Sequence, residues 1–366
     1  MNRIPVGVLG ATGMVGQQYL SLLAGHPWFE VCFVAASPRS AGKAYRDAVA
    51  ARWHLAKTAE ESVYGLTVED ANDVAAAKTA SAKGRCAFVF SALEMAKDET
   101  RRLEEAYAAA GIPVISNASA HRFTPDVPML IAEVNPHHID IIHTQRASRG
   151  WKSGFIVVKP NCSIQSYITP LYALLKAGYD VKRVIVTTLQ ALSGAGYPGV
   201  PSLDIIDNVV PYIGGEEEKS EQEPLKILGD IVDGAFVNRA EPRISAHCNR
   251  VAVLNGHTAC VSLEFGTRKP ALDEVKKLLA EFTSLPQALK LPSAPLHPII
   301  VREEPDRPQS RLDRDADKAM AVSVGRIRPC PVFDLRFVGL HHNTIRGAAG
   351  GGILNAELLK AKGYIG

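Results

Sequence analysis

The amino-terminal segment restricts the fold more than any other part of this chain, because it combines a strand, a glycine loop, a helix and a second strand. Residues 4–9 are apolar and run into loop 10–16, of sequence GATGMVG; residues 17–24 follow a helical pattern, and residues 30–36 are apolar again. This order predicts a βαβ unit, in which glycines let the backbone approach a pyrophosphate and the helix N-terminus binds its charge. The spacing G-x-x-G-x-x-G varies from the usual G-x-G-x-x-G, but its place between a strand and a helix favours nucleotide binding over a structural turn.

The loop after the second strand indicates which dinucleotide would bind. An NAD site usually has a carboxylate here for the ribose 2′-hydroxyl, whereas residues 36–42 read ASPRSAG and contain none. Arg39, flanked by Ser37 and Ser40, is suited to a 2′-phosphate, so the sequence favours NADP(H) over NAD. The alternative is a solvent-exposed arginine without a ligand. The expected cofactor contacts from the glycine loop are Gly10, Thr12, Gly13, Met14 and Val15.

Further strands extend the same sheet. Residues 87–92 form an apolar strand that ends in small residues, a charged helix is expected over 97–110, and another strand over 113–117. Together these segments predict a doubly wound, Rossmann-like sheet. Ser91 lies at the carboxyl end of a strand, where such sheets bind ligands, and is a further candidate for cofactor contact.

The pattern changes from about residue 160 onwards. Longer strands are expected over 181–191, 259–265 and 332–339 with few βα alternations, which predicts an α+β domain on a large, mostly antiparallel sheet. One face of such a sheet could form a dimer. The stretch 290–311 is rich in proline and charge, and we expect it to be a surface excursion. The predicted fold class is therefore α/β, a Rossmann-like domain followed by an α+β domain.

Composition excludes several classes of protein. The chain has 366 residues, 46% of them hydrophobic, and its 41 basic and 38 acidic residues give a net charge of +3, so no broad attraction to nucleic acid is expected. No apolar run approaches the ~18 to 20 residues of a membrane span and no signal peptide is evident, which predicts a cytoplasmic protein. Six cysteines occur without a C-x-x-C pair, so neither a metal site nor a disulfide framework is indicated.

Residues 159–166, of sequence KPNCSIQS, carry the strongest signal for chemistry. Apolar residues recur with a helical period from 163 to 177, which places Cys162 at the amino terminus of the predicted helix. Free N–H groups and the helix dipole favour a thiolate there, so we expect the pKa of Cys162 to fall from ~8.5 towards neutrality and the thiolate to act as a nucleophile. The alternative is a buried structural thiol.

An ordered series of segments resembles the aspartate-β-semialdehyde dehydrogenases, particularly the branch typical of archaea and fungi, over nearly the whole chain. The segments are GATGMVG at 10–16, SNASAHR at 116–122, PNCS at 160–163, QALSGAGYPG at 190–199, GGEEEK at 214–219, NRV at 249–251, GHT at 256–258 and NTIRG at 343–347. The resemblance implies an NADP-binding domain over 1–158, completed by a carboxyl-terminal helix at 346–366, and a catalytic and dimerisation domain over 159–345. It also implies a homodimer or a homotetramer.

A covalent mechanism follows from the same resemblance. Cys162 would attack the acyl carbon of L-4-aspartyl phosphate, expel phosphate and form a thioester, whose reduction with NADPH and collapse yield L-aspartate 4-semialdehyde. His257 would be the general acid/base, since its reference pKa near ~6.5 suits proton transfer. Gln165, one helical turn after Cys162, would orient the thiol or the substrate. This reaction belongs to the biosynthesis of lysine, threonine, methionine and isoleucine.

Substrate and nicotinamide contacts are implied as well. The substrate-binding residues would be Arg250 for the carboxylate, Glu216 for the ammonium, and Arg122, Lys219 and Asn161 for the phosphate. The residues implied on the nicotinamide side are Ser193, Gly194 and Asn343. Glu216 is the first of three consecutive glutamates, so Glu217 and Glu218 remain alternatives for its role.

Two other kinds of protein share parts of this pattern. Malonyl-CoA reductase and N-acetyl-γ-glutamyl-phosphate reductase have the same fold, cysteine and histidine, and differ in the acyl group that their pocket accepts. A non-catalytic NADP-binding sensor would use Cys162 as a redox switch. The set Arg250, Glu216 and Lys219 argues against a sensor, which has no evident need for substrate contacts.

Overall fold

The glycine loop lies where the strand order of the first sheet changes direction. The computed structural model describes residues 3–366, and its first sheet has the order β3-β2-β1-β4-β5-β6 with all pairs parallel. The strands are β1 (Ile4–Leu9), β2 (Phe29–Ala36), β3 (Val68–Asp70), β4 (Phe88–Ser91), β5 (Val114–Ser116) and β6 (Ile156–Val158). Because β1 pairs with β2 on one side and β4 on the other, the loop after β1 occupies the switch point where doubly wound sheets bind ligands.

Glycines make the turn after β1 possible. Gly10 has a φ of +73°, and a Cβ at this position would lie 2.3 Å from the carbonyl oxygen of Ala92. A Cβ at Gly16 would lie 2.2 Å from the oxygen of Gly10, so helix α1 (Met14–Leu23) can pack on the loop only because Gly16 has no side chain. The βαβ unit expected from the sequence is therefore present.

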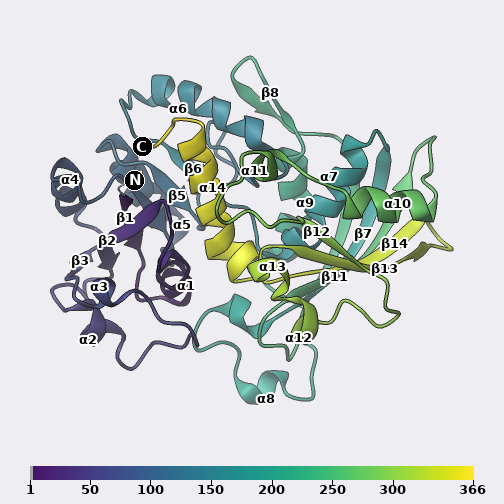
Figure 1. The fold of residues 1–366 in the computed structure, drawn as a ribbon, viewed down its shortest axis with the longest axis horizontal. Helices are drawn as coiled ribbons and strands as arrows, with labels where there is room; N and C mark the ends of the chain where they lie inside the picture. The colour runs from purple at the N-terminus through teal and green to yellow at the C-terminus, as the bar shows by residue number, and fades with distance from the viewer. Residues whose placement is uncertain (1–2) are drawn as a thin grey trace.

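Helices connect the strands of this sheet. The longer ones are α1, α4 (Val74–Ala82), α5 (Lys97–Ala109) and α6 (Ile141–Arg149); α2 (Tyr45–Val49) and α3 (Glu61–Tyr64) are short. The carboxyl-terminal helix α14 (Gly350–Ala361) follows a π-helical turn at Ile345–Ala349, and its Ile353 and Leu358 pack in the same apolar cluster as strand β1. Figure 1 shows α14, in yellow, between the purple and blue first sheet and the second half of the molecule.

The second sheet is mixed and mostly antiparallel, as expected. Its order is β10-β7-β11-β14-β13-β12, in which the three inner pairs are antiparallel and the two edge pairs are parallel. The strands are β7 (Val181–Gln190), β10 (Arg243–Arg250), β11 (His257–Phe265), β12 (Ile299–Arg302), β13 (Val322–Pro329) and β14 (Leu335–His341). Strand β12 lies inside the stretch 290–311, so the expectation of a surface excursion there was wrong: this segment supplies an edge strand.

Helices cover one face of the second sheet. They include α7 (Ile168–Lys176), α9 (Glu216–Ile227) and α10 (Leu272–Ala280). Four further helices are single turns: α8 (Ser202–Ile205), α11 (Leu285–Ala288), α12 (Ser310–Asp313) and α13 (Ala316–Ala319). The short strands β8 (Asp230–Val232) and β9 (Ala235–Val237) pair with each other outside both sheets. Val186 and Val261 are buried partners, whereas Ile185 and Cys260 are exposed. The other face is thus open to solvent.

One apolar cluster joins the two halves of the chain. It contains Val114 and Ile156 of the first sheet together with Val186 and Val261 of the second. A buried ion pair adds to this contact, since Arg346 Nη1 lies 3.0 Å from Glu133 Oε1 and both side chains are almost fully buried. A domain boundary at residues 158/159 stays a prediction.

Candidate active site

Cys162 lies at the start of a short turn that leads from the first sheet into the second half. It is the N-cap of a 3₁₀ turn over Ser163–Ser166, and α7 begins only at Ile168. The single helix expected over 163–177 is therefore interrupted. Pro170 explains the break, because it has no N–H to donate to the carbonyl of Ser166 four residues earlier and its ring would clash with that carbonyl.

His257 faces the thiol from the neighbouring sheet. Its Nε2 lies 3.4 Å from Cys162 Sγ, and its Nδ1 accepts a hydrogen bond of 3.0 Å from the backbone N–H of Ala191. The ring is buried. These contacts follow from the sheet register, since His257 opens β11 and Ala191 directly follows the antiparallel strand β7. The imidazole is thereby held with one nitrogen toward sulfur.

Burial sets the pKa values of this pair. It raises the pKa of the Cys162 thiol to about 11, helped by the carboxylate of Glu216 and opposed by the cation of Lys159. The expected lowering of this pKa at a helix terminus is not found, because desolvation outweighs the effect of a single 3₁₀ turn. Burial, together with the cation of Arg250, lowers the pKa of His257 to about 3. Burial therefore favours the neutral form of both groups.

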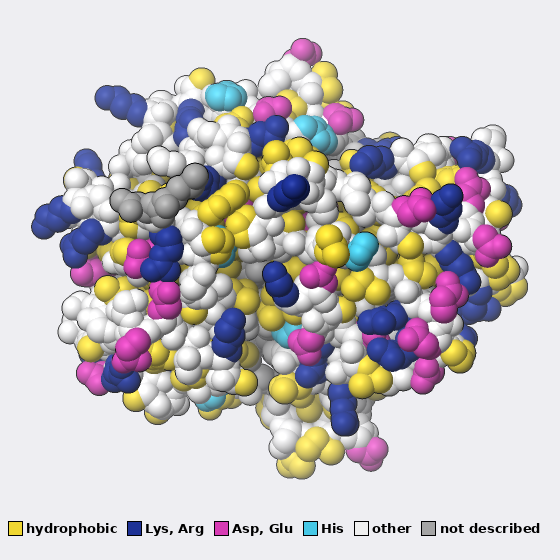
Figure 2. Space-filling view, viewed as in Figure 1, with side chains coloured by type: hydrophobic (Ala, Val, Ile, Leu, Met, Phe, Trp, Pro, Cys, Tyr) yellow, Lys and Arg dark blue, Asp and Glu magenta, His cyan; other side chains and the backbone are white. Residues whose placement is uncertain are grey.

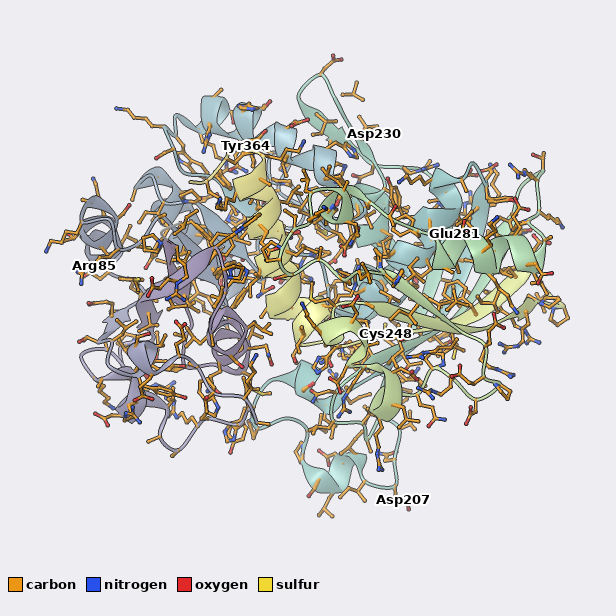
Figure 3. All side chains as sticks on the ribbon, viewed as in Figure 1. Arg85, Asp207, Asp230, Cys248, Glu281 and Tyr364 are labelled. Atoms are coloured by element: carbon orange, nitrogen blue, oxygen red, sulfur yellow. The ribbon has the colours of Figure 1, made fainter. Side chains whose placement is uncertain are left out.

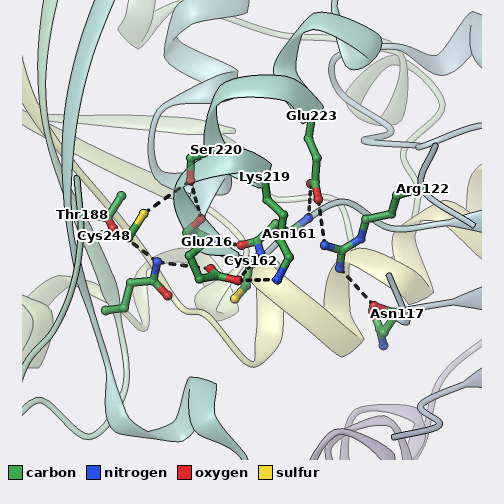
Figure 4. Close-up of polar contacts among 12 residues, drawn as sticks. Asn117, Arg122, Asn161, Cys162, Thr188, Glu216, Lys219, Ser220, Glu223 and Cys248 are labelled. Atoms are coloured by element: carbon green, nitrogen blue, oxygen red, sulfur yellow. Dashed lines mark hydrogen bonds and ion pairs between the residues drawn. The ribbon is translucent and has the colours of Figure 1, made fainter. Parts of the chain in front are cut away.

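Glu216 is the centre of a polar network next to Cys162 (Figure 4). Its Oε1 accepts hydrogen bonds from Asn161 Nδ2 at 2.8 Å and from Lys219 Nζ at 2.9 Å, and its Oε2 accepts one from Gln190 Nε2 at 3.3 Å. Glu217 instead accepts from the backbone N–H of Cys248, and Glu218 is exposed. Of the three consecutive glutamates, the structure places Glu216 near the thiol.

Arg122 approaches the site from the first sheet. Its guanidinium donates to Glu223 Oε1 at 2.8 Å and to the carbonyl oxygens of Lys159 and Asn117 at 3.1 and 3.2 Å. The other oxygen of Glu223 accepts the backbone N–H of Asn161 at 2.6 Å. One buried carboxylate therefore fixes two residues that were expected to contact phosphate.

Arg250 and Gln165 complete the surroundings of the thiol. Arg250 ends strand β10, is buried, and donates from Nη1 to the carbonyl oxygen of Ala191 at 2.7 Å. A Cβ at Gly194 would lie 3.0 Å from this nitrogen and 3.1 Å from a ring carbon of His257, so the chain passes close to both side chains here. Gln165 is also buried, and its Nε2 has no hydrogen-bond partner among residues 3–366.

Three residues of the site were not found from the sequence. They are Glu223, which fixes Arg122, Gln190, which contacts Glu216, and Ala191, whose N–H orients His257. Glu223 could have been found, because Glu216 and Glu223 are seven residues apart and so share one face of α9. The contacts of Gln190 and Ala191 depend on sheet register and leave no local signal.

A cavity at the glycine loop fits a dinucleotide. It has a volume of about 550 Å³, and its lining includes Gly10, Thr12, Gly13, Met14, Ser37 and Arg39. Arg39 and Ser37 are exposed at its edge, where they can reach a charged group. Three other candidates do not line it: Val15; Ser40, which is buried; and Ser91, whose hydroxyl donates to Glu104 Oε1 at 2.6 Å.

Ser193, one of the residues expected near the nicotinamide, lies at a second cavity, which shares Met14 with the cavity at the glycine loop. Asn343 Nδ2 donates to Ser193 Oγ at 2.8 Å, and Asn343 Oδ1 accepts the N–H of Gly256 at 2.8 Å. Ser193 and Met14 both line a second cavity of about 660 Å³ between the two halves of the chain. Asn343 thus holds the loop before His257 to the loop that carries Ser193.

The described residues contain neither a metal-binding cluster nor a helix that could span a membrane. Within 3–366, no three histidine, cysteine, aspartate or glutamate side chains come together so as to hold a metal ion. Every helix in this range is too short or too polar to cross a bilayer.

The arrangement is that of the semialdehyde dehydrogenases. Residues 5–142 match the family described as semialdehyde dehydrogenase, NAD binding domain, and residues 171–346 match semialdehyde dehydrogenase, dimerisation domain. Cys162 lies between these two matched regions, and His257, 3.4 Å from its sulfur, lies within the second.

Individual relatives narrow the family. The chain is 48% identical over 358 residues to aspartate-semialdehyde dehydrogenase of Methanothermobacter thermautotrophicus, covering 97% of this chain and 99% of the relative. It is 48% identical over 365 residues to the enzyme of the same name from Aspergillus fumigatus, with 98% of each covered. A crystal structure of aspartate semialdehyde dehydrogenase with NADP from Candida albicans superposes with a TM-score of 0.89 at 43% identity over 100% of both chains. The chain belongs to the aspartate-semialdehyde dehydrogenase family.

Proposed function

We propose that this chain is an NADP-dependent enzyme that converts L-4-aspartyl phosphate into L-aspartate 4-semialdehyde and phosphate through a thioester on Cys162. The observation that carries the proposal is the 3.4 Å contact between Cys162 Sγ and His257 Nε2, beside an arginine and a glutamate that suit an amino-acid substrate. Membership of the aspartate-semialdehyde dehydrogenase family supports the same reaction and the biosynthesis of lysine, threonine, methionine and isoleucine.

Substrate recognition follows from charge and geometry. Arg250 uses one nitrogen to hold Ala191 O, which leaves the rest of its planar fork for a carboxylate. Glu216 offers a carboxylate to the substrate ammonium. Lys219 and Asn161, both bonded to Glu216, and Arg122 from the opposite side supply donors for the phosphate.

The chemical step then needs a nucleophile and a proton donor. The thiolate of Cys162 attacks the acyl carbon, and phosphate leaves with the electron pair of the broken C–O bond. His257 presents Nε2–H to the substrate oxygen, because its Nδ1 accepts the hydrogen of Ala191. This donor stabilises the negative charge that develops on the oxygen during thioester formation and reduction. Gln165, three residues after Cys162, would orient the acyl group.

NADP(H) is the proposed cofactor, and it supplies or accepts the hydride. The cradle at Gly10 and Gly13 lets backbone approach a pyrophosphate, and Arg39 with Ser37 suits the 2′-phosphate. Ser193, Gly194 and Asn343 would line the nicotinamide side. The Candida albicans relative, crystallised with NADP, supports this choice.

We also propose a homodimer or homotetramer in the cytoplasm. The matched family region at 171–346 is described as a dimerisation domain. The open face of the second sheet, with Ile185 and Cys260 exposed, gives such a contact a surface. Figure 2 shows charged side chains of both signs interspersed over the visible face. Hydrophobic side chains gather on the segment that projects at the bottom of this view, and the label of Asp207 in Figure 3 marks the tip of that segment.

Trapping the acyl-enzyme tests the covalent step. The full chain is mixed with L-4-aspartyl phosphate without cofactor, and the modified residue is located by peptide mass spectrometry. We expect an aspartyl group on Cys162, and none after Cys162→Ala. Cys260→Ala, which removes an exposed thiol, serves as the control and should leave the labelling unchanged. Acylation at another residue, or none in the wild-type protein, would refute the mechanism.

A further inference from the structure

Two large cavities of the molecule meet at one place. The cavity at the glycine loop has a volume of about 550 Å³, and the cavity between the two halves of the chain has one of about 660 Å³. In the described chain, only Met14 and His54 line both. Arg39, the expected contact of the 2′-phosphate, lines the first cavity alone, and Ser193, expected on the nicotinamide side, lines the second alone. A dinucleotide that reaches both residues therefore passes the place where Met14 and His54 lie.

The backbone of His54 is tied to the glycine loop through one buried side chain. Gln17 of helix α1 donates from Nε2 to the carbonyl oxygen of Thr12 at 2.9 Å and to that of Arg52 at 2.8 Å. Its Oε1 accepts the N–H of His54 at 3.4 Å. Because Gln17 is only 1% exposed, these hydrogen bonds are shielded from water. Residues 52–54 are thus held against the loop that would bind the pyrophosphate.

A second contact orients the imidazole of His54. Its ring stacks on that of Tyr197, with centroids 3.9 Å apart and an interplanar angle of 14°. Tyr197 comes from the second half of the chain, four residues after Ser193, and lines the cavity at the glycine loop. Both side chains are exposed, so the stack adds little to the apolar core. Since stacking occupies the face of the imidazole, the N–H at the ring edge stays available to donate a hydrogen bond.

The surroundings of His54 suit an anion. Helix α1 begins at Met14, so the free N–H groups of its first turn lie at this place. The charged side chains that line the cavity at the glycine loop are two arginines, Arg39 and Arg52, and one carboxylate, Glu94. Of the two residues shared by the cavities, His54 has a side-chain N–H and Met14 has none.

We propose that His54 donates a hydrogen bond to the phosphate on the nicotinamide side of bound NADP(H), and that Tyr197 positions the imidazole for this contact. The phosphate on the adenosine side would instead bind at Gly10 and Gly13. His54 is then a binding residue for the cofactor, whereas Tyr197 acts only through His54. This inference rests on the proposed function, because it takes NADP(H) as the cofactor.

Three nucleotides locate the contact when the full chain is titrated in a calorimeter. NADPH contains both phosphates of the bridge, 2′-phospho-ADP-ribose lacks only the nicotinamide, and adenosine 2′,5′-bisphosphate ends at the adenosine-side phosphate. His54→Ala should raise the Kd of the first two by at least ~10-fold, as the loss of a hydrogen bond to a charged group does, and leave the Kd of the third unchanged. An unchanged Kd for NADPH or for 2′-phospho-ADP-ribose, or an equal loss with all three, would overturn the assignment.

Variants of Tyr197 test the positioning role. Tyr197→Phe keeps the stack and should retain the wild-type Kd for NADPH, whereas Tyr197→Ala should raise it by about 3- to 10-fold, the range expected for an aromatic pair. In a His54→Ala background, Tyr197→Ala should cause no further loss, because it acts through the imidazole. A Phe variant that binds as weakly as the Ala variant, or additive losses in the double variant, would contradict positioning by stacking.

Matched controls come from exposed residues outside both cavities. His137→Ala and Tyr212→Ala remove the same kinds of side chain and should leave all three Kd values unchanged; weaker binding in either would contradict a local role of the stack. The wild-type protein separates the two levels of the account. If it binds none of the nucleotides, the proposed cofactor fails. If it binds NADPH and His54→Ala binds NADPH equally well, only the role of His54 is refuted.

Discussion

His257 is held as a hydrogen-bond donor toward the reacting centre. The N–H of Ala191 occupies Nδ1, and burial lowers the pKa of the ring to about 3, so the imidazolium is disfavoured. We expect His257→Asn, which is too short to reach the substrate oxygen, to lower kcat by about 10²- to 10⁴-fold with little change in KM. Steady-state kinetics with the semialdehyde measure both constants. An unchanged kcat would remove His257 from the chemical step.

The proposed role of Arg250 requires two contacts at once, one with the carbonyl oxygen of Ala191 and one with the substrate carboxylate. Lysine keeps the positive charge but cannot hold Ala191 O and a carboxylate in one plane. Arg250→Lys should therefore raise the KM for the semialdehyde by at least ~10-fold, equivalent to about 1.4 kcal/mol. Arg243→Lys, at an exposed position of the same strand, is the matched control and should leave KM unaltered. Equal KM values for the wild-type protein and Arg250→Lys would count against carboxylate binding.

At the scale of elements, the sequence predicts those helices, strands and loops whose signals lie in neighbouring residues. The glycine loop, the strand over 87–92 and the helix over 97–110 were found because their signals lie within a few residues. The break at Pro170 in the helix after Cys162 was missed because apolar periodicity continues through it. The raised pKa of Cys162 was missed because it depends on burial and on Glu216, a residue far away in the sequence.

A buried carboxylate links two strand ends of the first sheet. Glu104 Oε1 accepts hydrogen bonds of 2.6 Å from Ser91 and Ser116, and burial raises the pKa of Glu104 from 4.5 to about 7. Between pH 4.5 and about 7 the folded protein binds more protons than the unfolded chain, so the free energy of unfolding falls as the pH rises. The loss is roughly 3 kcal/mol, since each unit of pKa shift corresponds to about 1.36 kcal/mol. Glu104→Gln, which resembles the protonated acid, should remove this loss. Urea unfolding at pH 5 and pH 8 measures it, and an equal pH dependence in both proteins would contradict the prediction.

At the scale of the whole molecule, the second sheet leaves one face for self-association. Ile185 and Cys260 alternate with buried neighbours and are exposed on that face. Ile185→Glu should shift the protein toward monomers, because it would bury a charge in an apolar contact. Light scattering after size-exclusion chromatography gives the mass. Val332→Glu, at an exposed apolar position in the loop before β14, is the control and should keep the wild-type mass. A wild-type mass for Ile185→Glu would place the contact between subunits on another surface.

The reaction itself is tested most directly by following reduction of NADP at the nicotinamide absorbance. One arm contains L-aspartate semialdehyde with and without phosphate, and the parallel arm contains malonate semialdehyde and CoA. We expect sustained formation of NADPH only with aspartate semialdehyde and phosphate, because Arg250 and Glu216 are the proposed partners of its carboxylate and ammonium and phosphate would release the acyl group from Cys162. NADPH formation solely in the CoA arm, or in neither arm, would contradict the proposed function.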